Sequence, residues 1–175
     1  MNLVILNSLE SLKEFTADTI IDVRAPAEYA DDHLPGAINL PVLDDTQRAE
    51  IGTVYKRNPF MARKKGAALV ALNAANHLQG PLAAKDGGWK PLIYCWRGGQ
   101  RSGAFATILE QVGWRVQLLE GGYRSYRREV VKALYDRPLL HRLRFLGGRP
   151  GTAKTALLHQ LAAKGAQILD LEGIA

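Results

Sequence analysis

The chain is poor in cysteine and histidine and contains no long apolar segment. Among its 175 residues are one cysteine and four histidines. An internal disulfide is therefore impossible, and no cysteine and histidine cluster has the spacing of a zinc site. The sequence contains no run of about 18 apolar residues, the length needed to span a bilayer. Its first residues lack the basic flank and the cleavage site of a signal peptide. We expect a cytoplasmic protein with no membrane contact, no metal site and no tightly bound cofactor.

The composition is that of an ordinary globular protein with an excess of positive charge. Hydrophobic residues make up 47% of the chain and charged residues 23%. Lysine and arginine total 23 against 17 aspartates and glutamates, which gives a formal net charge of +6. The length accommodates one complete domain and part of another. The charge is compatible with a nucleic-acid partner without requiring one.

The single cysteine, Cys95, lies where a short apolar run meets a glycine-rich segment. Leu92, Ile93 and Tyr94 precede it, and apolar residues recur at helical spacing from Ala104 onward. This order predicts a strand, a tight loop and a helix, with the cysteine at the end of the strand. A lone cysteine is most often a small buried hydrophobe, so the alternative of a reactive thiolate depends on its neighbours.

Those neighbours favour the thiolate. Backbone N–H groups of a loop that enters a helix can converge on one point, where the helix N-terminus adds positive potential. We expect this anion-binding loop to lower the pKa of Cys95 and to make it the catalytic nucleophile, with Gly98 and Gly99 both adopting positive φ values. The remaining predicted members of the loop are Arg97, Arg101 and Ser102.

The loop fits two chemistries, and residues 20–41 distinguish between them. Five residues between Cys95 and Arg101 match the phosphate loop of cysteine-dependent phosphatases. Upstream, however, the chain contains in order Asp-Val-Arg, Glu-Tyr and His-Leu-Pro-Gly-Ala-Ile-Asn-Leu-Pro. Together with the cysteine loop, this ordered signature closely resembles the rhodanese family. The sequence departs from the family at Asp32, where a glycine is usual.

The resemblance implies an α/β domain with a central, mostly parallel sheet flanked by helices, and sulfur or selenium carried on the cysteine. It also implies that Asp22 and Arg24 brace the cysteine loop rather than react. For His33 we expect a structural hydrogen bond instead of a general-base role. The loop is one residue longer than in typical rhodaneses, which keeps a phosphatase as an alternative.

Two further segments narrow the resemblance to one branch. The cysteine loop, Ile-Gly-Thr-Val-Tyr-Lys at 51–56 and Leu-Glu-Gly-Gly-Tyr-Arg at 119–124 are similar to the bacterial tRNA 2-selenouridine synthases, which carry a rhodanese domain and then a P-loop domain. The resemblance implies replacement of sulfur by selenium in wobble 2-thiouridine. It further implies selenophosphate and geranyl diphosphate as substrates, S-geranylation as the route, and tRNA and a selenophosphate-producing enzyme as partners.

Residues 143–155 supply a candidate phosphate loop. A predicted strand enters a glycine-rich turn that leads into an apolar helix. The predicted diphosphate-binding residues are Gly148, Gly151, Lys154 and Thr155, with Thr155 placed to hold a magnesium ion. Ala153 stands where the usual pattern has glycine, and its methyl group would obstruct close approach of a phosphate. The alternative is a glycine-rich connection before an ordinary helix.

The domain organisation follows from these motifs. We predict a rhodanese domain at 1–136, a linker at 137–141, and at 142–175 the first strand, loop, helix and strand of a P-loop domain. The second strand is expected at 167–171. Such a short piece cannot cover a parallel sheet, so it should pack on the first domain or on another copy, or be poorly ordered.

Basic residues near aromatic ones give candidate RNA contacts, although such faces are often merely solvated. A helix after Gly122 is expected to bury Tyr126, Val130 and Leu134. The predicted RNA-binding residues are Lys56, Arg57, Arg124, Arg127 and Arg128. The aromatic residues available to stack on an unpaired base are Tyr55, Trp96 and Tyr123.

Three other functions fit parts of the sequence. A stand-alone thiosulfate-type sulfurtransferase would need neither the phosphate loop nor the basic helices. A cysteine phosphatase is supported by the loop length alone. A catalytically inactive RNA-binding module would bind tRNA without using Cys95.

Overall fold

The computed structural model describes every residue except 137, 139–141, 172 and 175. The chain divides into two compact units, Met1–Pro138 and Leu139–Ala175, each described here by itself. The predicted linker at 137–141 lies, apart from Pro138, outside the described residues. The boundary between a first and a second domain therefore stays a prediction.

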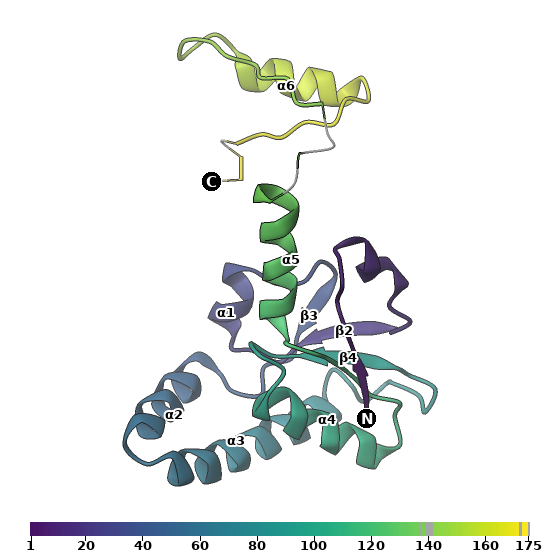
Figure 1. The fold of residues 1–175 in the computed structure, drawn as a ribbon, viewed down its shortest axis with the longest axis vertical. Coiled ribbons are helices and arrows are strands. Elements are labelled where there is room, and N and C mark those ends of the chain that lie inside the picture. The colour runs from purple at the N-terminus through teal and green to yellow at the C-terminus, as the bar shows by residue number, and fades with distance from the viewer. Residues whose placement is uncertain (137, 139–141, 172, 175) are drawn as a thin grey trace. The chain divides into compact units, whose positions relative to one another are not determined.

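Five short strands of the first unit form one sheet, in the spatial order β1-β5-β4-β2-β3. The strands β2, β3 and β4 are labelled in Figure 1. Every pairing is parallel; Ile21, for example, lies opposite Ile38 and Ile93. The carboxyl ends of all five strands therefore meet at one edge, where the loops that follow them lie close together. The strands are β1 (Asn2–Val4), β2 (Thr19–Asp22), β3 (Ala37–Asn39), β4 (Pro91–Tyr94) and β5 (Gln117–Leu119).

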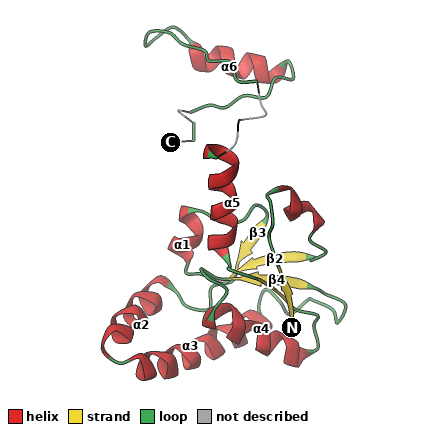
Figure 2. Cartoon of the chain, viewed as in Figure 1, coloured by secondary structure: helices red, strands yellow, loops and turns green. Residues whose placement is uncertain are grey.

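Helices cover both faces of this sheet (Figure 2). Side chains alternate along a strand, so Ile93 of β4 packs with α3 (Pro59–Gln79) and α4 (Gln100–Val112), whereas Leu92 and Tyr94 pack on the opposite side. That side carries α1 (Pro26–Asp31), α5 (Tyr123–Tyr135) and the 3₁₀ helix η1 (Glu10–Glu14). The prediction of a parallel α/β fold flanked by helices is confirmed.

Local signals define the helical hairpin that precedes β4. Helix α2 (Asp45–Arg57) begins with a capping box, in which Asp44 accepts from the Gln47 N–H at 2.7 Å and Gln47 accepts from the Asp44 N–H at 3.1 Å. Asn58 both ends α2 and caps α3, accepting from the Met61 N–H at 3.1 Å. The two helices pack against each other, and the basic residues near 56–65 lie around their junction.

The apolar stripe predicted for α5 is partly wrong. Tyr126 and Val130 are half-buried, but Leu134 is 53% exposed, and the helix buries Ser125 and Glu129 instead. The reason is that only the first turns of α5 lie against the sheet, while its last turn extends beyond it (Figure 1). Apolar spacing identified the helix correctly but overestimated how much of it is covered.

The second unit contains the expected helix but not the expected strands. Helix α6 (Lys154–Ala163) follows the glycine-rich loop. Neither residues 143–147 nor residues 167–171 form a strand, because no other described segment of this unit pairs with them. A strand needs a neighbour for its backbone hydrogen bonds and a covered face, and none of the described residues of this unit is buried. Packing of 142–175 on the first domain stays a prediction.

Candidate active site

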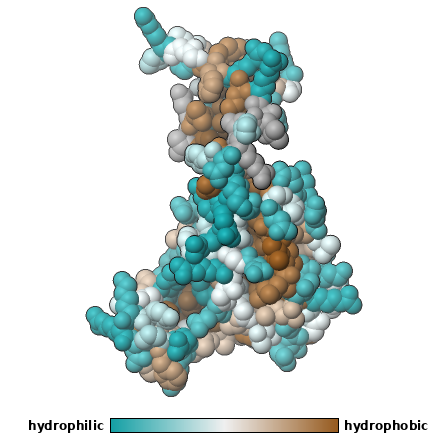
Figure 3. All heavy atoms as spheres, in the orientation of Figure 1, coloured by the Kyte–Doolittle hydropathy of each residue, from teal (hydrophilic) through white to brown (hydrophobic). Residues whose placement is uncertain are grey.

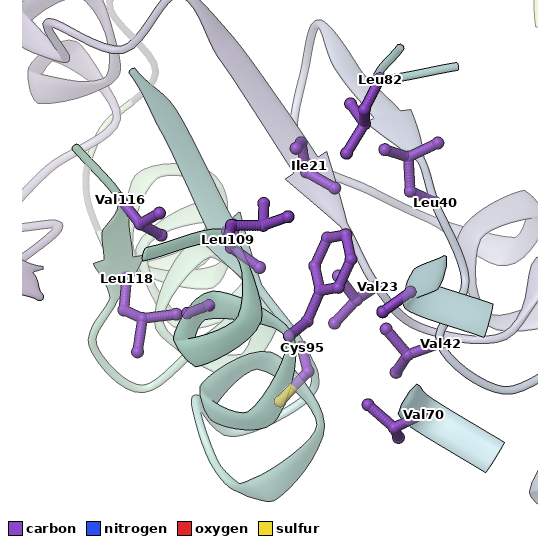
Figure 4. Close-up of a cluster of buried hydrophobic side chains, with 14 of the residues drawn as sticks. Ile21, Val23, Leu40, Val42, Val70, Leu82, Cys95, Leu109, Val116 and Leu118 are labelled. Carbon is purple, nitrogen blue, oxygen red and sulfur yellow. The ribbon is translucent and has the colours of Figure 1, made fainter. Parts of the chain in front are cut away.

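Cys95 follows β4 directly and lies at the edge of the core cluster beside α3 and α4 (Figure 4). Its side chain is 4% exposed. The sulfur accepts hydrogen bonds from the Gly99 N–H at 3.3 Å and from the Ser102 hydroxyl at 3.1 Å. The thiol is thus held at the start of α4, as the sequence predicts for a residue between strand and helix.

The surroundings of Cys95 favour its ionised form. Burial alone raises the pKa of the thiol, but hydrogen bonds from the Ser102 hydroxyl and from three backbone N–H groups lower it by more. The three N–H groups belong to Ser102, Arg97 and Gly99. The net effect places the pKa of Cys95 below the ordinary value, so the nucleophilic thiolate is available nearer neutral pH.

A glycine outside the loop fixes the loop's position. Gly98 has a φ of +69°, as expected, but Gly99 has a φ of −103°, so the prediction of a positive φ there is wrong. Two further positive φ values lie in the turn beside the loop, at Gly121 (+71°) and Gly122 (+57°). A Cβ at Gly122 would lie 2.2 Å from the Cys95 carbonyl oxygen and 2.6 Å from the Gly98 nitrogen. Only glycine permits this close approach.

Helix α5 begins directly on the cysteine loop. The Tyr123 N–H donates to the carbonyl oxygen of Cys95 at 2.8 Å, and the Arg124 N–H donates to that of Trp96 at 3.2 Å. The first N–H groups of a helix have no partner within the helix, so the loop carbonyls satisfy them. The loop is therefore held from both sides, by α4 that follows it and by the N-terminus of α5.

A buried ion pair lies next to this junction. Arg24 donates through Nε and Nη2 to the Asp22 carboxylate at 2.9 and 2.7 Å, and both residues are almost fully buried. Burial lowers the pKa of Arg24, but the hydrogen bond and charge of Asp22 raise it by more, so the guanidinium stays charged. It lies 4.1 Å from the ring centre of Tyr123. Arg24 thus contacts Tyr123, whose N–H holds the cysteine loop, and Asp22 holds Arg24 in place. The bracing role of the pair stays a prediction.

Asp32, the residue that departs from the family pattern, accepts hydrogen bonds from both Tyr123 and Arg24. The Tyr123 hydroxyl donates to the Asp32 carboxylate at 2.6 Å, and the backbone carbonyl of Asp32 accepts from Arg24 at 2.5 Å. Burial and the neighbouring carboxylate raise the pKa of Tyr123 to about 12. His33 makes the structural contact expected for it, with Nδ1 2.9 Å from the Tyr29 carbonyl oxygen.

The two arginines of the loop differ in their surroundings. Arg101 donates to the Glu28 carboxylate at 2.6 and 3.3 Å, which links α4 to α1. Burial raises the pKa of Glu28, but the hydrogen bond from Arg101 lowers it by more. Arg97 is exposed. The guanidinium of Arg101 is therefore occupied by a carboxylate, and Arg97 is the loop cation that faces solvent.

The predicted RNA-binding residues fall into two groups on opposite faces of the sheet. Lys56 and Arg57 lie at the end of α2, which packs on α3. Lys56 lines a hollow of about 630 Å³ along α2 that reaches Arg101, next to an apolar cavity of about 340 Å³ between α2, α3 and α4. The other three residues, Arg124, Arg127 and Arg128, are exposed on the first turns of α5.

The predicted diphosphate-binding residues lie together in the second unit. Gly148, Gly151, Lys154 and Thr155 belong to one loop and the first turn of α6. The Lys154 ammonium donates to the Arg149 carbonyl oxygen at 3.1 Å, inside that loop. Ala153 has a φ of +55°, a left-handed conformation that glycine would adopt at little cost. The backbone thus follows the glycine conformation although alanine occupies the position.

A comparison with protein families assigns the chain to the class that its fold and its cysteine loop indicate. The family model described as the rhodanese-like domain matches residues 6–129, and the chain belongs to this family. A solved structure, the N-terminal domain of a Clostridium difficile 630 protein described as ATP/GTP binding, is 35% identical and covers 74% of this chain and 99% of that one, with a TM-score of 0.62.

The curated proteins that the chain resembles include several with the same name. The chain is 34% identical to the tRNA 2-selenouridine synthase of Bdellovibrio bacteriovorus over 89% of its length, and 38% identical to that of Nitrosomonas europaea over 92%. It is 39% identical to the tRNA 2-selenouridine synthase of Salmonella arizonae over 91%. The matched regions are 41%, 42% and 44% of those proteins, so the chain spans less than half of their length. Within the described residues, no helix is long and apolar enough to cross a membrane.

Several residues of the site escaped sequence reasoning. Gly122 was not predicted as a site residue, and Tyr123 was predicted only as an aromatic residue available for base stacking. The structure shows that their turn contacts the cysteine loop. Glu28 lies in the family signature, yet its pairing with Arg101 joins segments far apart in the sequence. The sequence does contain one indication of these contacts, at Asp32. A carboxylate at a position where the family usually has glycine needs a hydrogen-bond donor, and that donor is Tyr123.

Proposed function

We propose that this chain is the rhodanese-containing part of a tRNA 2-selenouridine synthase, which replaces sulfur by selenium in wobble 2-thiouridine. Cys95 is the nucleophile of the reaction, and the observation that carries this role is the lowered pKa of a thiol held by N–H and hydroxyl donors. Likeness over about 90% of the chain to proteins of that name supports the substrate. A tRNA substrate places the reaction in the cytoplasm.

Each part of the site has a role in this proposal. The N–H groups around the sulfur, together with the exposed Arg97, stabilise the anion that forms on the chalcogen, and Asp22 with Arg24 keeps the loop in place. Arg101 contributes by anchoring α4 to Glu28 unless the anion displaces that carboxylate. Selenophosphate supplies selenium and arrives from the enzyme that makes it.

The second unit has the chemistry of a diphosphate site. Gly148, Gly151 and Lys154 surround the start of α6, where N–H groups and an ammonium attract phosphate oxygens. We propose that geranyl diphosphate binds there and that S-geranylation converts the sulfur into a leaving group. A magnesium ion would bind at Thr155 and neutralise diphosphate charge. Because relatives extend well beyond this chain, the complete reaction is a proposal for the longer protein.

The test is mass spectrometry of tRNA from cells whose own copy of the gene carries one substitution. We expect Cys95→Ala to abolish 2-selenouridine while tRNA binding, measured on purified protein, changes less than about threefold. Lys154→Ala should weaken binding of geranyl diphosphate about tenfold, as expected for loss of one charged hydrogen bond. If cells with Cys95→Ala still contain 2-selenouridine, the nucleophile assignment is wrong.

The same purified protein separates this function from two others. Rapid formation of thiocyanate from thiosulfate and cyanide, with no change in tRNA, would favour a stand-alone sulfurtransferase. Rapid hydrolysis of an aryl phosphate that is lost in Cys95→Ser would favour a phosphatase. The pairing of Arg101 with Glu28 argues against the phosphatase, because that arginine would have to bind the phosphate.

A further inference from the structure

The residue after the reactive cysteine exposes a large aromatic surface. Trp96 is 41% exposed, although Cys95 beside it is 4% exposed. The other two tryptophans, Trp89 and Trp114, are 5% and 7% exposed and pack edge to face in the core. The indole is therefore accessible to a ligand, whereas the thiol of the preceding residue is buried.

The indole is held in place from behind. Its ring is stacked on that of Tyr123, with centroids 5.3 Å apart and planes inclined by 30°. The Arg24 guanidinium lies 5.9 Å from the Trp96 ring centre, and the Asp32 carboxylate fixes the Tyr123 hydroxyl. The Trp96 backbone carbonyl accepts from the Arg124 N–H. A side chain that is already ordered loses little conformational entropy when it binds a ligand.

Exposed arginines follow Trp96 in the cysteine loop and occupy the first turns of α5. Arg97 is the next residue and is exposed, and α5 starts on the Trp96 carbonyl with exposed arginines at 124, 127 and 128. The surface over α5 is largely hydrophilic (Figure 3). An aromatic face among guanidinium groups is the chemistry that binds single-stranded RNA, because bases stack on the ring while cations contact phosphates.

We propose that Trp96 is the stacking platform for an unpaired nucleobase of the RNA substrate, with Arg97 and Arg124 beside the flanking phosphates. This deepens the proposed function and rests on it for the choice of RNA. Trp96 follows the reactive cysteine directly in the chain, so a base stacked on it binds to the cysteine loop itself. The other aromatic candidates fit less well, because Tyr123 is 6% exposed behind Trp96 and Tyr55 lines the hollow of α2.

Tryptophan fluorescence of the 175-residue chain tests this directly, since the other two indoles are buried. The probe is a short RNA hairpin with unpaired uridines in its loop, and the control RNA is a blunt duplex of the same length. The hairpin should quench the exposed emission and the duplex should not. Trp96→Leu should abolish the quenching and weaken hairpin binding, measured with labelled RNA, about tenfold.

Two variants separate stacking from loss of fold or of any exposed aromatic residue. Trp96→Phe keeps a ring and should bind within about threefold of the natural protein. Tyr135→Leu removes a tyrosine that is 78% exposed at the far end of α5 and should leave hairpin binding unchanged. Equal binding of the hairpin to the natural protein and to Trp96→Leu overturns the proposal, as does quenching by the duplex alone. Because no readout uses Cys95, this failure is distinct from that of the nucleophile assignment.

Discussion

Replacing Ser102 by alanine should raise the pKa of the only thiol in the chain. The Ser102 hydroxyl is fully buried and donates to the Cys95 sulfur at 3.1 Å. A hydrogen bond to a charged group contributes about 1.5–3 kcal/mol, and 1.36 kcal/mol corresponds to one pKa unit. Loss of this bond disfavours the thiolate, so the pKa of Cys95 should rise in Ser102→Ala, and the thiolate population at a pH below the midpoint should fall at least about tenfold.

The pH dependence of alkylation measures this shift. The thiolate is the reacting form, so the rate with iodoacetamide should rise with pH and reach half its maximum at the pKa. The midpoint should lie below the ordinary thiol value in the natural protein and move upward in Ser102→Ala. Thiolate absorbance in the ultraviolet gives the same midpoint without requiring reagent access.

A matched control comes from Ser125, which is also buried but donates to the Gly122 carbonyl oxygen at 2.7 Å. Ser125→Ala should leave the midpoint unchanged, because Ser125 donates no hydrogen bond to the thiolate. If Ser102→Ala and Ser125→Ala give the same midpoint, hydrogen bonding from Ser102 does not control the thiol.

Three further substitutions test the geometry around the site. Gly122→Ala should lower the free energy of unfolding, measured in urea, by at least about 2 kcal/mol, since its methyl group would lie 2.2 Å from a carbonyl oxygen; Gly121→Ala, whose nearest neighbour would be a side-chain carbon at 3.2 Å, should cost less. Arg24→Met should cost about 3–5 kcal/mol in the same assay, because it leaves Asp22 buried without its cation; a loss below 1 kcal/mol would show that the pair is not needed for stability. Ala153→Gly removes a left-handed alanine and should stabilise the start of α6 by about 1 kcal/mol, seen as slower amide hydrogen exchange there; unchanged exchange would contradict the strain.

The sequence predicts the parts of the fold that depend on local patterns. Apolar runs that end in Asp22 and Tyr94 identify strands β2 and β4, and helical spacing after Gly99 identifies α4. These predictions succeed because strand and helix formation follow side-chain periodicity and capping. The predictions of a strand entering the glycine-rich turn of 143–155 and of a strand at 167–171 are wrong, because pairing needs partners that these residues do not have within the described chain.

The lowered pKa of Cys95 was also predictable, whereas the long-range contacts around the cysteine loop were not. A thiol between a strand and a helix already indicates a lowered pKa, and the structure gives that direction with Ser102 as a main donor. Contacts across the sequence, such as Tyr123 with Asp32 or Arg101 with Glu28, depend on which loops meet at the edge of the sheet. Such pairs cannot be derived from one sequence without the topology that brings them together.

The contact between α5 and the cysteine loop has a consequence for synthesis of the chain. Cys95 leaves the ribosome well before Tyr123 and Arg124, whose N–H groups hold the carbonyls of Cys95 and Trp96. Until α5 has emerged, these two carbonyls lack the partners that fix the loop, although Arg97, Gly99 and Ser102, whose groups donate to the sulfur, have already been made. A nascent chain that ends before Tyr123 therefore has the donors that lower the pKa of the thiol but not the helix that holds their loop from the other side.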